Sequence, residues 1–309
     1  MTRIFTGIDC LAHDAGYGFP ESPARLDRIL AGFDSSWDVA EVSEHPRLAE
    51  VLETVHEPCY LEIFRRAVER GDGLLGSSDN PLTTETWRSA VSAASAAMAA
   101  ADWVAGGNGK AFAAVRPPGH HAESRLAMGF CYLNNVAVLV EHLIRNHGLQ
   151  KIAIFDFDVH HGNGTQEIFY ERSDVLFASM HQWPFYPGTG AESETGRGPG
   201  EDKTVNVALA AGTGDREFLR AMRDSIIPAL ASHQPEALVV SAGFDAWRGD
   251  PLGGLKLSRA AYAEIGETLR EFADRVCDGR LISVLEGGYD LAALSGLVRS
   301  YLRGRVQSD

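Results

Sequence analysis

Cysteine is scarce in this sequence, and its few copies do not form a recognisable framework. The four cysteines, Cys10, Cys59, Cys131 and Cys277, are far apart and share no regular spacing. This excludes a disulfide scaffold and a cysteine-based zinc site, and it suits buried thiols in a reducing compartment. The chain also lacks an apolar run of about 18 residues, and its first residues, MTRIFTGIDC, lack the apolar core of a secretion signal. We therefore expect a cytoplasmic protein with no membrane span.

Positive charge is also in short supply. The chain has 28 Lys and Arg against 42 Asp and Glu, a formal net charge of −14. Proteins that wrap nucleic acid usually carry basic patches, so we expect no nucleic-acid partner. The sequence has no internal repeat, no low-complexity block and no linker rich in proline or serine, which favours one domain over residues 1–309. Whether the chain forms a homo-oligomer stays open.

Apolar segments of strand character alternate with helical patterns along the chain. The predicted strands are residues 3–8, 111–115, 151–157, 175–179, 204–209, 236–242 and 280–286. Helices are predicted from Ser22, with Pro23 in the first turn, and from Thr84 to Gly106, and also over residues 132–146, 215–231, 258–277 and 291–303. Continuous apolar strands separated by helices indicate a parallel sheet that is covered on both faces. The predicted fold class is therefore α/β, doubly wound.

Four of the predicted strands lead directly into polar loops that contain glycine. The loops are RPPGHH (116–121), DVHHGN (158–163), GFD (243–245) and GGY (287–289). In open parallel sheets the ligand binds at the carboxyl edge of the strands. We therefore expect the four loops to converge, although they span about 180 residues of sequence.

The loop that follows residues 151–157 contains the residue types of a metal site. Asp156, Asp158 and His160 alternate, so in an extended segment they share one face. Asp158, His160 and Asp245 as ligands, with one position left open, are typical of a catalytic zinc site. An isolated D-x-H is more often a strand-end cap with surface polarity. The three other polar strand ends favour the metal site.

The remaining polar residues of these loops suit acid–base chemistry. His120 and His121 follow R-P-P-G at the same predicted edge. Their basicity would be set by partners on the other ring nitrogen, for which Asp156 and Asn163 are available. Tyr289, after two glycines, is placed to donate its phenol to a developing oxyanion. A packed tyrosine beside two turn glycines is an equal alternative for that position taken alone.

Together these segments closely resemble the zinc-dependent histone deacetylase family, with its acetoin-utilisation and acetylpolyamine-hydrolase relatives. Six motifs match in order between residues 5 and 300: RPPGHH (116–121), GFCYLNN (129–135), DFDVHHGNGTQ (156–166), FYPGTG (185–190), SAGFDAWRGDPLGG (241–254) and LEGGYD (285–290). The resemblance implies an arginase-like α/β domain with a central, mostly parallel eight-stranded sheet flanked by helices. Asn163 within the DVHHGNGTQ run resembles the class II branch.

The resemblance also implies a role for each matching position. One zinc ion per chain would be held by Asp158, His160 and Asp245. The implied catalytic residues are His120 paired with Asp156, His121 as general base and acid with Asn163, and Tyr289. The implied substrate tunnel comprises Gly129, Phe130, Tyr186, Leu252, Gly287 and Gly288.

Two further positions match the family less closely. Arg25 lies where the family has an arginine near the inner channel, but Phe19 departs from the frequent histidine. Asp79 aligns loosely with a rim residue that binds the substrate backbone.

Members of the family also bind monovalent cations, usually potassium, and the resemblance implies two such sites. The first would use Asp156, the carbonyls of Asp158 and His160, Ser179 and the carbonyl of Met180. The second would use the carbonyls of Phe169, Arg172, Val175 and Phe218. Because backbone atoms dominate the second site, the sequence tests it poorly.

The expected reaction is hydrolysis of an N-acetyl amide, most simply N6-acetyl-lysine in a protein or peptide, to acetate and free amine. An acetylpolyamine amidohydrolase, or a deacylase of another small acylated amine, is the alternative. Leu252 stands where polyamine-selective relatives place a glutamate, which favours acyl-lysine. A binuclear manganese hydrolase needs a second aspartate where Trp247 stands. An inactive binding module is disfavoured because every catalytic position is retained.

Two conspicuous features are predicted to be structural. The glycine-rich segment 188–202 superficially suggests phosphate binding, but it does not lie between a strand and a helix at the required spacing. His161 is expected to point away from the metal face.

Overall fold

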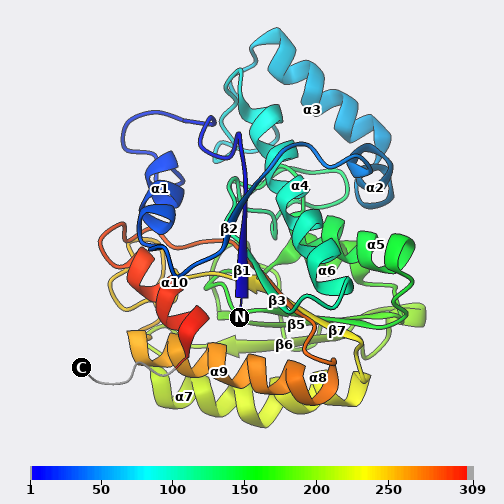
Figure 1. Ribbon diagram of the computed structural model, residues 1–309, viewed down its shortest axis with the longest axis vertical. Helices are drawn as coiled ribbons and strands as arrows, with labels where there is room; N and C mark the ends of the chain where they lie inside the picture. The colour runs from blue at the N-terminus through cyan, green and yellow to red at the C-terminus, as the bar shows by residue number, and fades with distance from the viewer. Residues whose placement is uncertain (1, 305–309) are drawn as a thin grey trace.

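A single parallel sheet organises the computed structural model, which describes residues 2–304 (Figure 1). Within those residues eight strands are hydrogen-bonded in the order β2-β1-β3-β8-β7-β4-β5-β6. Every neighbouring pair is parallel. The strands are β1 (Thr2–Gly7), β2 (Val39–Val42), β3 (Lys110–Ala113), β4 (Ile152–Asp156), β5 (Val175–Gln182), β6 (Thr204–Leu209), β7 (Ala237–Ala242) and β8 (Leu281–Leu285). The predicted α/β class with an eight-stranded sheet is confirmed.

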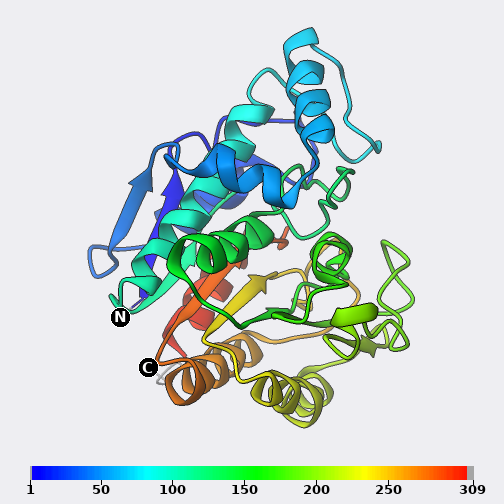
Figure 2. The same cartoon turned by 90° about the vertical axis from the view of Figure 1, so that its right-hand side faces the viewer.

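Helices cover both faces of this sheet, as Figures 1 and 2 show. They are α1 (Pro23–Ala31), α2 (Leu48–Val55), α3 (Pro58–Arg70), α4 (Thr86–Ala105), α5 (Asn135–His147), α6 (Asn163–Phe169), α7 (Asp215–Ala221), α8 (Ile227–His233), α9 (Arg259–Val276) and α10 (Leu294–Arg303). A π-helical turn, Met222–Ile226, joins α7 to α8, so the predicted helix over 215–231 is one continuous helical segment. No helix in the described residues is long and apolar enough to cross a membrane.

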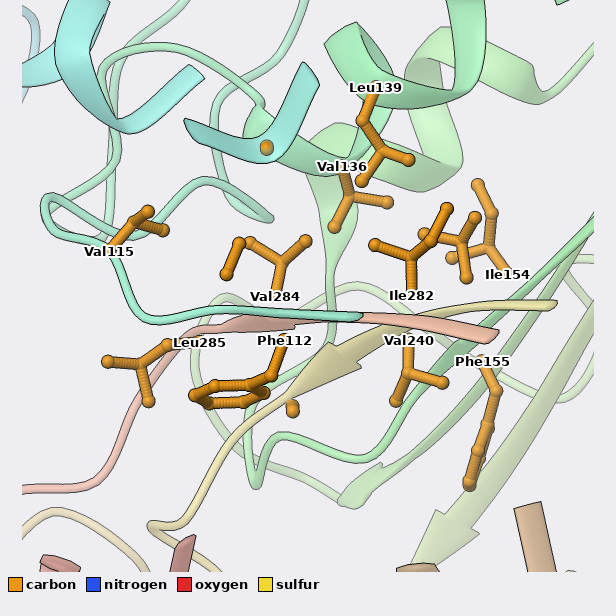
Figure 3. Close-up of a cluster of buried hydrophobic side chains, with 14 of the residues drawn as sticks. Phe112, Val115, Val136, Leu139, Ile154, Phe155, Val240, Ile282, Val284 and Leu285 are labelled. Atoms are coloured by element: carbon orange, nitrogen blue, oxygen red, sulfur yellow. The ribbon is translucent and has the colours of Figure 1, made fainter. Parts of the chain in front are cut away.

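The core forms because the central strands are apolar on both faces. Figure 3 places Ile154 and Phe155 on opposite sides of the sheet, with Val136 and Leu139 of α5 on the same side as Ile154. Both β4 side chains are fully buried, and each such burial stabilises the fold by about 1.5–3 kcal/mol. The buried apolar residues form one contiguous cluster. The single domain over residues 1–309 stays a prediction, and its ends, residue 1 and residues 305–309, lie outside the described residues.

Helix α4 is buried along most of its length, and most of its residues are alanine or serine. Its buried positions include Ala93, Ala94, Ala96, Ala97, Ala100 and Ala101. Small side chains let the helix axis approach both strands β1 and β3 and helix α5. This packing fixes where the end of α4 lies relative to the end of α5.

Some local predictions differ from the structure. Strand β2 was not predicted; it is a four-residue edge strand with half-exposed side chains. Helices α2, α3 and α6 were not predicted either. Ser22 occupies the N-cap of α1 without a side-chain capping bond. Helix α4 begins at Thr86, because the Thr86 hydroxyl accepts from the Thr83 N–H and ends the preceding turn there.

Candidate active site

The four polar loops meet because their strands are neighbours in the sheet. Strands β3, β8, β7 and β4 lie side by side at its centre. All four are parallel, so their carboxyl ends open on the same edge. The sequence-predicted convergence therefore takes place at the position where ligands bind in open α/β sheets.

Asp158, His160 and Asp245 come together at this edge. The Nδ1 atom of His160 lies 3.0 Å from Oδ1 of Asp158 and 3.3 Å from Oδ2 of Asp245. One ligand atom from each residue lies within 4.8 Å of the other two. Both carboxylates are fully buried. The donor set of two carboxylates and one imidazole nitrogen is that of a catalytic zinc site.

One atom of this group has no hydrogen-bond partner. Oδ2 of Asp245 is buried and accepts no hydrogen bond from the described residues, although Nδ1 of His160 lies 3.3 Å away. The other carboxylate oxygens are oriented by backbone donors. The N–H of Val159 donates to Oδ1 of Asp245 at 2.9 Å, and that of Gly287 donates to Oδ2 of Asp158 at 2.8 Å. A buried unpaired carboxylate oxygen is costly. A metal ion at this point resolves the cost, so the residues fit zinc.

The charges in the group support the same conclusion. Burial, and then the charge of Asp158, raises the pKa of Asp245. Burial alone would lower the pKa of His160, but the two carboxylates outweigh it and raise that pKa to about 9. The protein alone therefore draws positive charge to this position, which a divalent cation supplies without protonating the imidazole.

His120 and His121 lie beside the group, and their surroundings separate their pKa values. Nδ1 of His120 lies 2.9 Å from Oδ2 of Asp156. Burial opposes its charge, but Asp156 and Asp158 prevail and raise the pKa of His120 to about 10. Burial, with the neighbouring His120 and His160, holds the pKa of His121 well below 6.5. Two adjacent imidazoles thus differ in role: one favours the charged form and the other stays a neutral base.

The tautomer of His121 follows from its partner. Nδ1 of His121 lies 2.7 Å from Oδ1 of Asn163. The amide of Asn163 is oriented because its Nδ2 donates to Oε1 of Glu123 at 2.8 Å. The amide oxygen therefore accepts from Nδ1–H, and the lone pair of His121 is on Nε2. Sequence reasoning missed Glu123, which lies two residues after the matched motif.

Tyr289 is held at the pocket by contacts to its backbone and its ring. Its N–H donates to Oδ2 of Asp250 at 2.7 Å. Cζ of Arg25 lies 4.7 Å from its ring centre. Burial raises the pKa of Tyr289 well above its usual value. The phenol therefore keeps its proton and acts as a hydrogen-bond donor.

Arg25 supports this loop from behind. It is fully buried and donates to the carbonyls of Gly288 and Glu286 at 2.7 and 2.5 Å. Glu21 neutralises it at 3.0 Å and also pairs with Arg116. Arg25 therefore fixes the loop after β8, while the pocket itself is lined by other residues.

Glu286 is a buried carboxylate that sequence reasoning did not single out. Its Oε2 accepts the N–H groups of Gly119 and His120 at 2.7 and 3.1 Å. Burial raises its pKa to about 7. Glu286 thus joins the loop after β8 to the loop that carries both histidines. Its only sequence signal is its position at the end of a buried strand.

A narrow pocket of about 150 Å³ leads to the metal-site residues. It is lined by Asp79, His121, Gly129, Phe130, His160, Tyr186, Leu252 and Tyr289. Four of the six predicted tunnel residues are in this set. Asp79, matched only loosely from the sequence, is in it too, and its Oδ2 accepts from the Tyr186 hydroxyl and the Gly129 N–H at 2.9 Å each.

The pocket wall includes an uncommon backbone conformation. Gly129 and Phe130 have φ of 57° and 68°. A Cβ at Gly129 would collide with the ring of His121. A left-handed phenylalanine costs about 1–3 kcal/mol, and the edge-on contacts of Phe130 with Phe19 and Tyr289 hold it there.

Two further glycines were predicted to line the tunnel. Gly287 and Gly288 do not line the pocket. A Cβ at Gly287 would collide with the carboxylates of Asp245 and Asp158, so this glycine allows the backbone to approach the metal-site residues.

The two predicted monovalent-cation sites stay predictions. Asp156 and Ser179 are register partners on β4 and β5, which brings the first set together. In the second set, Phe169 ends α6 and Val175 begins β5, and the carbonyl of Phe169 already accepts from the N–H of Arg172 at 3.0 Å.

The structure also bears on the alternatives. Trp247, where a second metal would need an aspartate, donates its indole N–H to Asp290 at 3.0 Å. In segment 188–202 the N–H groups of Gly190 and Ala191 donate to the carboxylate of Glu194, so they are not free for phosphate. His161 contacts Thr189 and Gln166 rather than the metal-site residues, in line with its structural assignment.

Comparisons with known proteins agree with this geometry. The histone deacetylase domain matches residues 19–305. The chain is 39% identical to histone deacetylase 14, chloroplastic, of Arabidopsis thaliana over 94% of its length and 73% of that protein. It is 42% identical to a probable deacetylase of Archaeoglobus fulgidus over 94% of this chain and 82% of the relative. The crystal structure of the acetylpolyamine aminohydrolase from Burkholderia pseudomallei superposes with a TM-score of 0.87 at 31% identity, covering 97% of each chain. The chain belongs to the histone deacetylase family of amidohydrolases.

Proposed function

We propose that this protein hydrolyses N-acetyl-lysine in peptides or proteins, releasing acetate and the free amine, with one zinc ion held by Asp158, His160 and Asp245. The observation that carries the proposal is the pocket, which is narrow and has His121, His160 and Tyr289 on its lining. A pocket of about 150 Å³ suits a short acyl group on a linear stem.

His121 and His120 have different roles in the reaction, because their surroundings favour different protonation states. When bound, zinc acts as a Lewis acid that polarises the carbonyl and activates water. His121, neutral and with its lone pair on Nε2, accepts the proton of the attacking water and later gives it to the leaving amine. His120 keeps its charge through Asp156 and stabilises negative charge beside it.

Tyr289 provides the oxyanion donor. Its phenol stays protonated and lines the pocket opposite the metal-site residues. A fixed donor directed at the developing oxyanion stabilises the transition state more than the ground state. Glu286 and Arg25 position the loops that carry His120 and Tyr289.

An acetylated polyamine is the second candidate substrate. The Burkholderia pseudomallei protein whose structure matches this chain over 97% of both chains is an acetylpolyamine aminohydrolase. Asp79, at the pocket, offers a carboxylate to a second ammonium group. Leu252, on the same lining, offers none.

A comparison of kcat/KM tests the assignment. Acetyl-lysine peptides, longer-acyl peptides and acetylated polyamines are compared, and we expect the acetyl-lysine peptides to be hydrolysed best.

The Tyr289→Phe variant should keep its zinc and lose about 10²–10³ in kcat. Tyr262→Phe is the matched control, because its buried hydroxyl has no hydrogen-bond partner among the described residues. Near-normal kcat for Tyr289→Phe would refute the role, and preference for polyamines would make the second candidate the substrate.

A further inference from the structure

A second group of histidines surrounds one carboxylate outside the pocket described above. Asp102 lies in the last turn of α4, and His142 and His147 lie toward the end of α5. His45 comes from the segment between β2 and α2. Helices α4 and α5 end just before β3 and β4 begin, so Asp102 and His147 lie toward the amino ends of these strands, whereas His45 follows the carboxyl end of β2 by three residues.

All three imidazoles direct Nε2 at the same carboxylate. Nε2 of His142 and Nε2 of His147 each lie 2.7 Å from Oδ1 of Asp102. Nε2 of His45 lies 2.9 Å from Oδ2. The ligand atoms of His45, Asp102 and His142 are all within 4.8 Å of one another. Ligands at about 2.0–2.1 Å from a tetrahedral zinc are about 3.3 Å apart, so binding would draw these three ligand atoms together from separations of up to 4.8 Å. His147 lies outside this group of three and would have to move toward the ion.

The orientation of His142 points to a cation at the centre. Its Nδ1 lies 2.7 Å from Oδ1 of Asn146. When Nδ1–H donates to that oxygen, as in most metal-binding histidines, the lone pair of Nε2 faces the Asp102 oxygen. Two acceptor atoms at 2.7 Å require a proton or a metal ion between them. With the proton on Nδ1 of each ring, three neutral imidazoles and one carboxylate suit a divalent metal.

The surroundings favour a cation and leave it a path from solvent. The carboxyl ends of α4 and α5 contribute partial negative charge here. The cluster lines a surface pocket of about 260 Å³. The side chains of His45 and His142 are 9% and 2% exposed, whereas that of Asp102 is 44% exposed. One contact opposes binding: the N–H of Arg47 lies 3.2 Å from Nδ1 of His45, and this bond is lost when Nδ1 carries the proton.

We propose that His45, Asp102 and His142, with His147 as the fourth ligand, bind a second divalent transition-metal ion of the zinc type. Three imidazole nitrogens and one carboxylate oxygen match the ligand preferences of zinc. Four protein ligands leave no open position, so the ion is structural and joins the segment before α2 to the ends of α4 and α5.

Zinc content per chain tests the proposal on tag-free protein dialysed against a weak chelator. We expect two zinc ions in the unmodified protein, one in Asp102→Asn, one in Asp245→Ala and none in the double variant. His233→Gln, which replaces a buried histidine outside both groups, should keep two. Equal zinc content in Asp102→Asn and the unmodified protein overturns the proposal. Loss of one zinc in Asp102→Asn but none in Asp245→Ala supports this site and contradicts the active-site ligands instead.

Thermal unfolding provides a second readout. After removal of all metal, added zinc should raise the melting temperature of Asp245→Ala but not that of Asp245→Ala/Asp102→Asn. His147→Gln changes a side chain that is 27% exposed and avoids damage to the core. It should weaken zinc binding at this site at least tenfold, and unchanged affinity would remove His147 from the ligand set.

Discussion

At the scale of single residues, the candidate site depends on pairs that fix protonation states. Asn163 is the most informative of them, because its neutral amide holds His121 without adding charge. A carboxylate at this position would favour the imidazolium. Burial and the neighbouring His120 and His160 lower the pKa of His121, and the side chain at position 163 is the contact to its Nδ1 that a substitution can change.

We predict that Asn163→Asp moves the acidic limb of the kcat/KM profile upward by roughly one pH unit. Protonated His121 cannot accept a proton, so activity is lost as the pH falls through its pKa, and the introduced carboxylate raises that pKa. Profiles on an acetyl-lysine peptide measure the shift. Asn206→Asp, a similarly buried asparagine that contacts Gln166, is the control. An unmoved limb in Asn163→Asp would exclude His121 as the titrating base.

The metal and acid–base residues could be predicted because they lie in polar loops that follow buried strands and match motifs of a known family. Asp158, His160 and Asp245 carry that signal in the sequence itself. Glu286 and Glu123 could not be assigned, since they act on backbone and amide groups that only the fold brings near.

At the scale of secondary-structure elements, the helices before α4 are tied to the site by a buried histidine. His56 follows α2; its Nδ1–H donates to the carbonyl of Glu123 at 3.0 Å, and its Nε2 accepts from the N–H of Asn134 at 2.9 Å. Both nitrogens are used by the neutral ring. Burial lowers the pKa of His56 to about 4 from 6.5.

Stability should therefore fall in acid through His56. Below pH 6.5 the imidazole of His56 binds a proton in the unfolded chain but not in the folded protein. Its contribution to the free energy of unfolding is therefore fully present above pH 6.5 and is lost as the pH falls toward 4. Between pH 7.5 and 5.5 this amounts to about 1.3 kcal/mol. The free energy of unfolding, measured with urea at the two pH values, should fall less in His56→Gln than in the unmodified protein, and the difference should equal this contribution. Equal losses in both proteins would contradict the assignment.

The elements missed from the sequence were missed for different reasons. Strand β2 has four residues and one exposed face, so it lacks an apolar run. Helix α3 did carry signals, with Pro58 in its first turn and Gly71 in the left-handed conformation after its end. A helix over this segment was therefore predictable from the sequence, whereas β2 was not.

At the scale of the whole molecule, the order of the strands creates the site. That β3, β8, β7 and β4 are neighbours cannot be read from composition or periodicity, because the connections between them are long. The sequence could predict that four polar loops share an edge. The fold adds that these loops lie at the centre of that edge.

The most direct test of the account is acetate release and zinc content measured on the same samples of Asp102→Asn during zinc titration of metal-free protein. Of the two groups of potential metal ligands found among residues 2–304, this variant keeps intact the one formed by Asp158, His160 and Asp245. The account predicts that the metal-free protein is inactive, and that hydrolysis of an acetyl-lysine peptide rises linearly to a break at one zinc per chain. Substantial hydrolysis without metal, or full activity in Asp245→Ala, would contradict it.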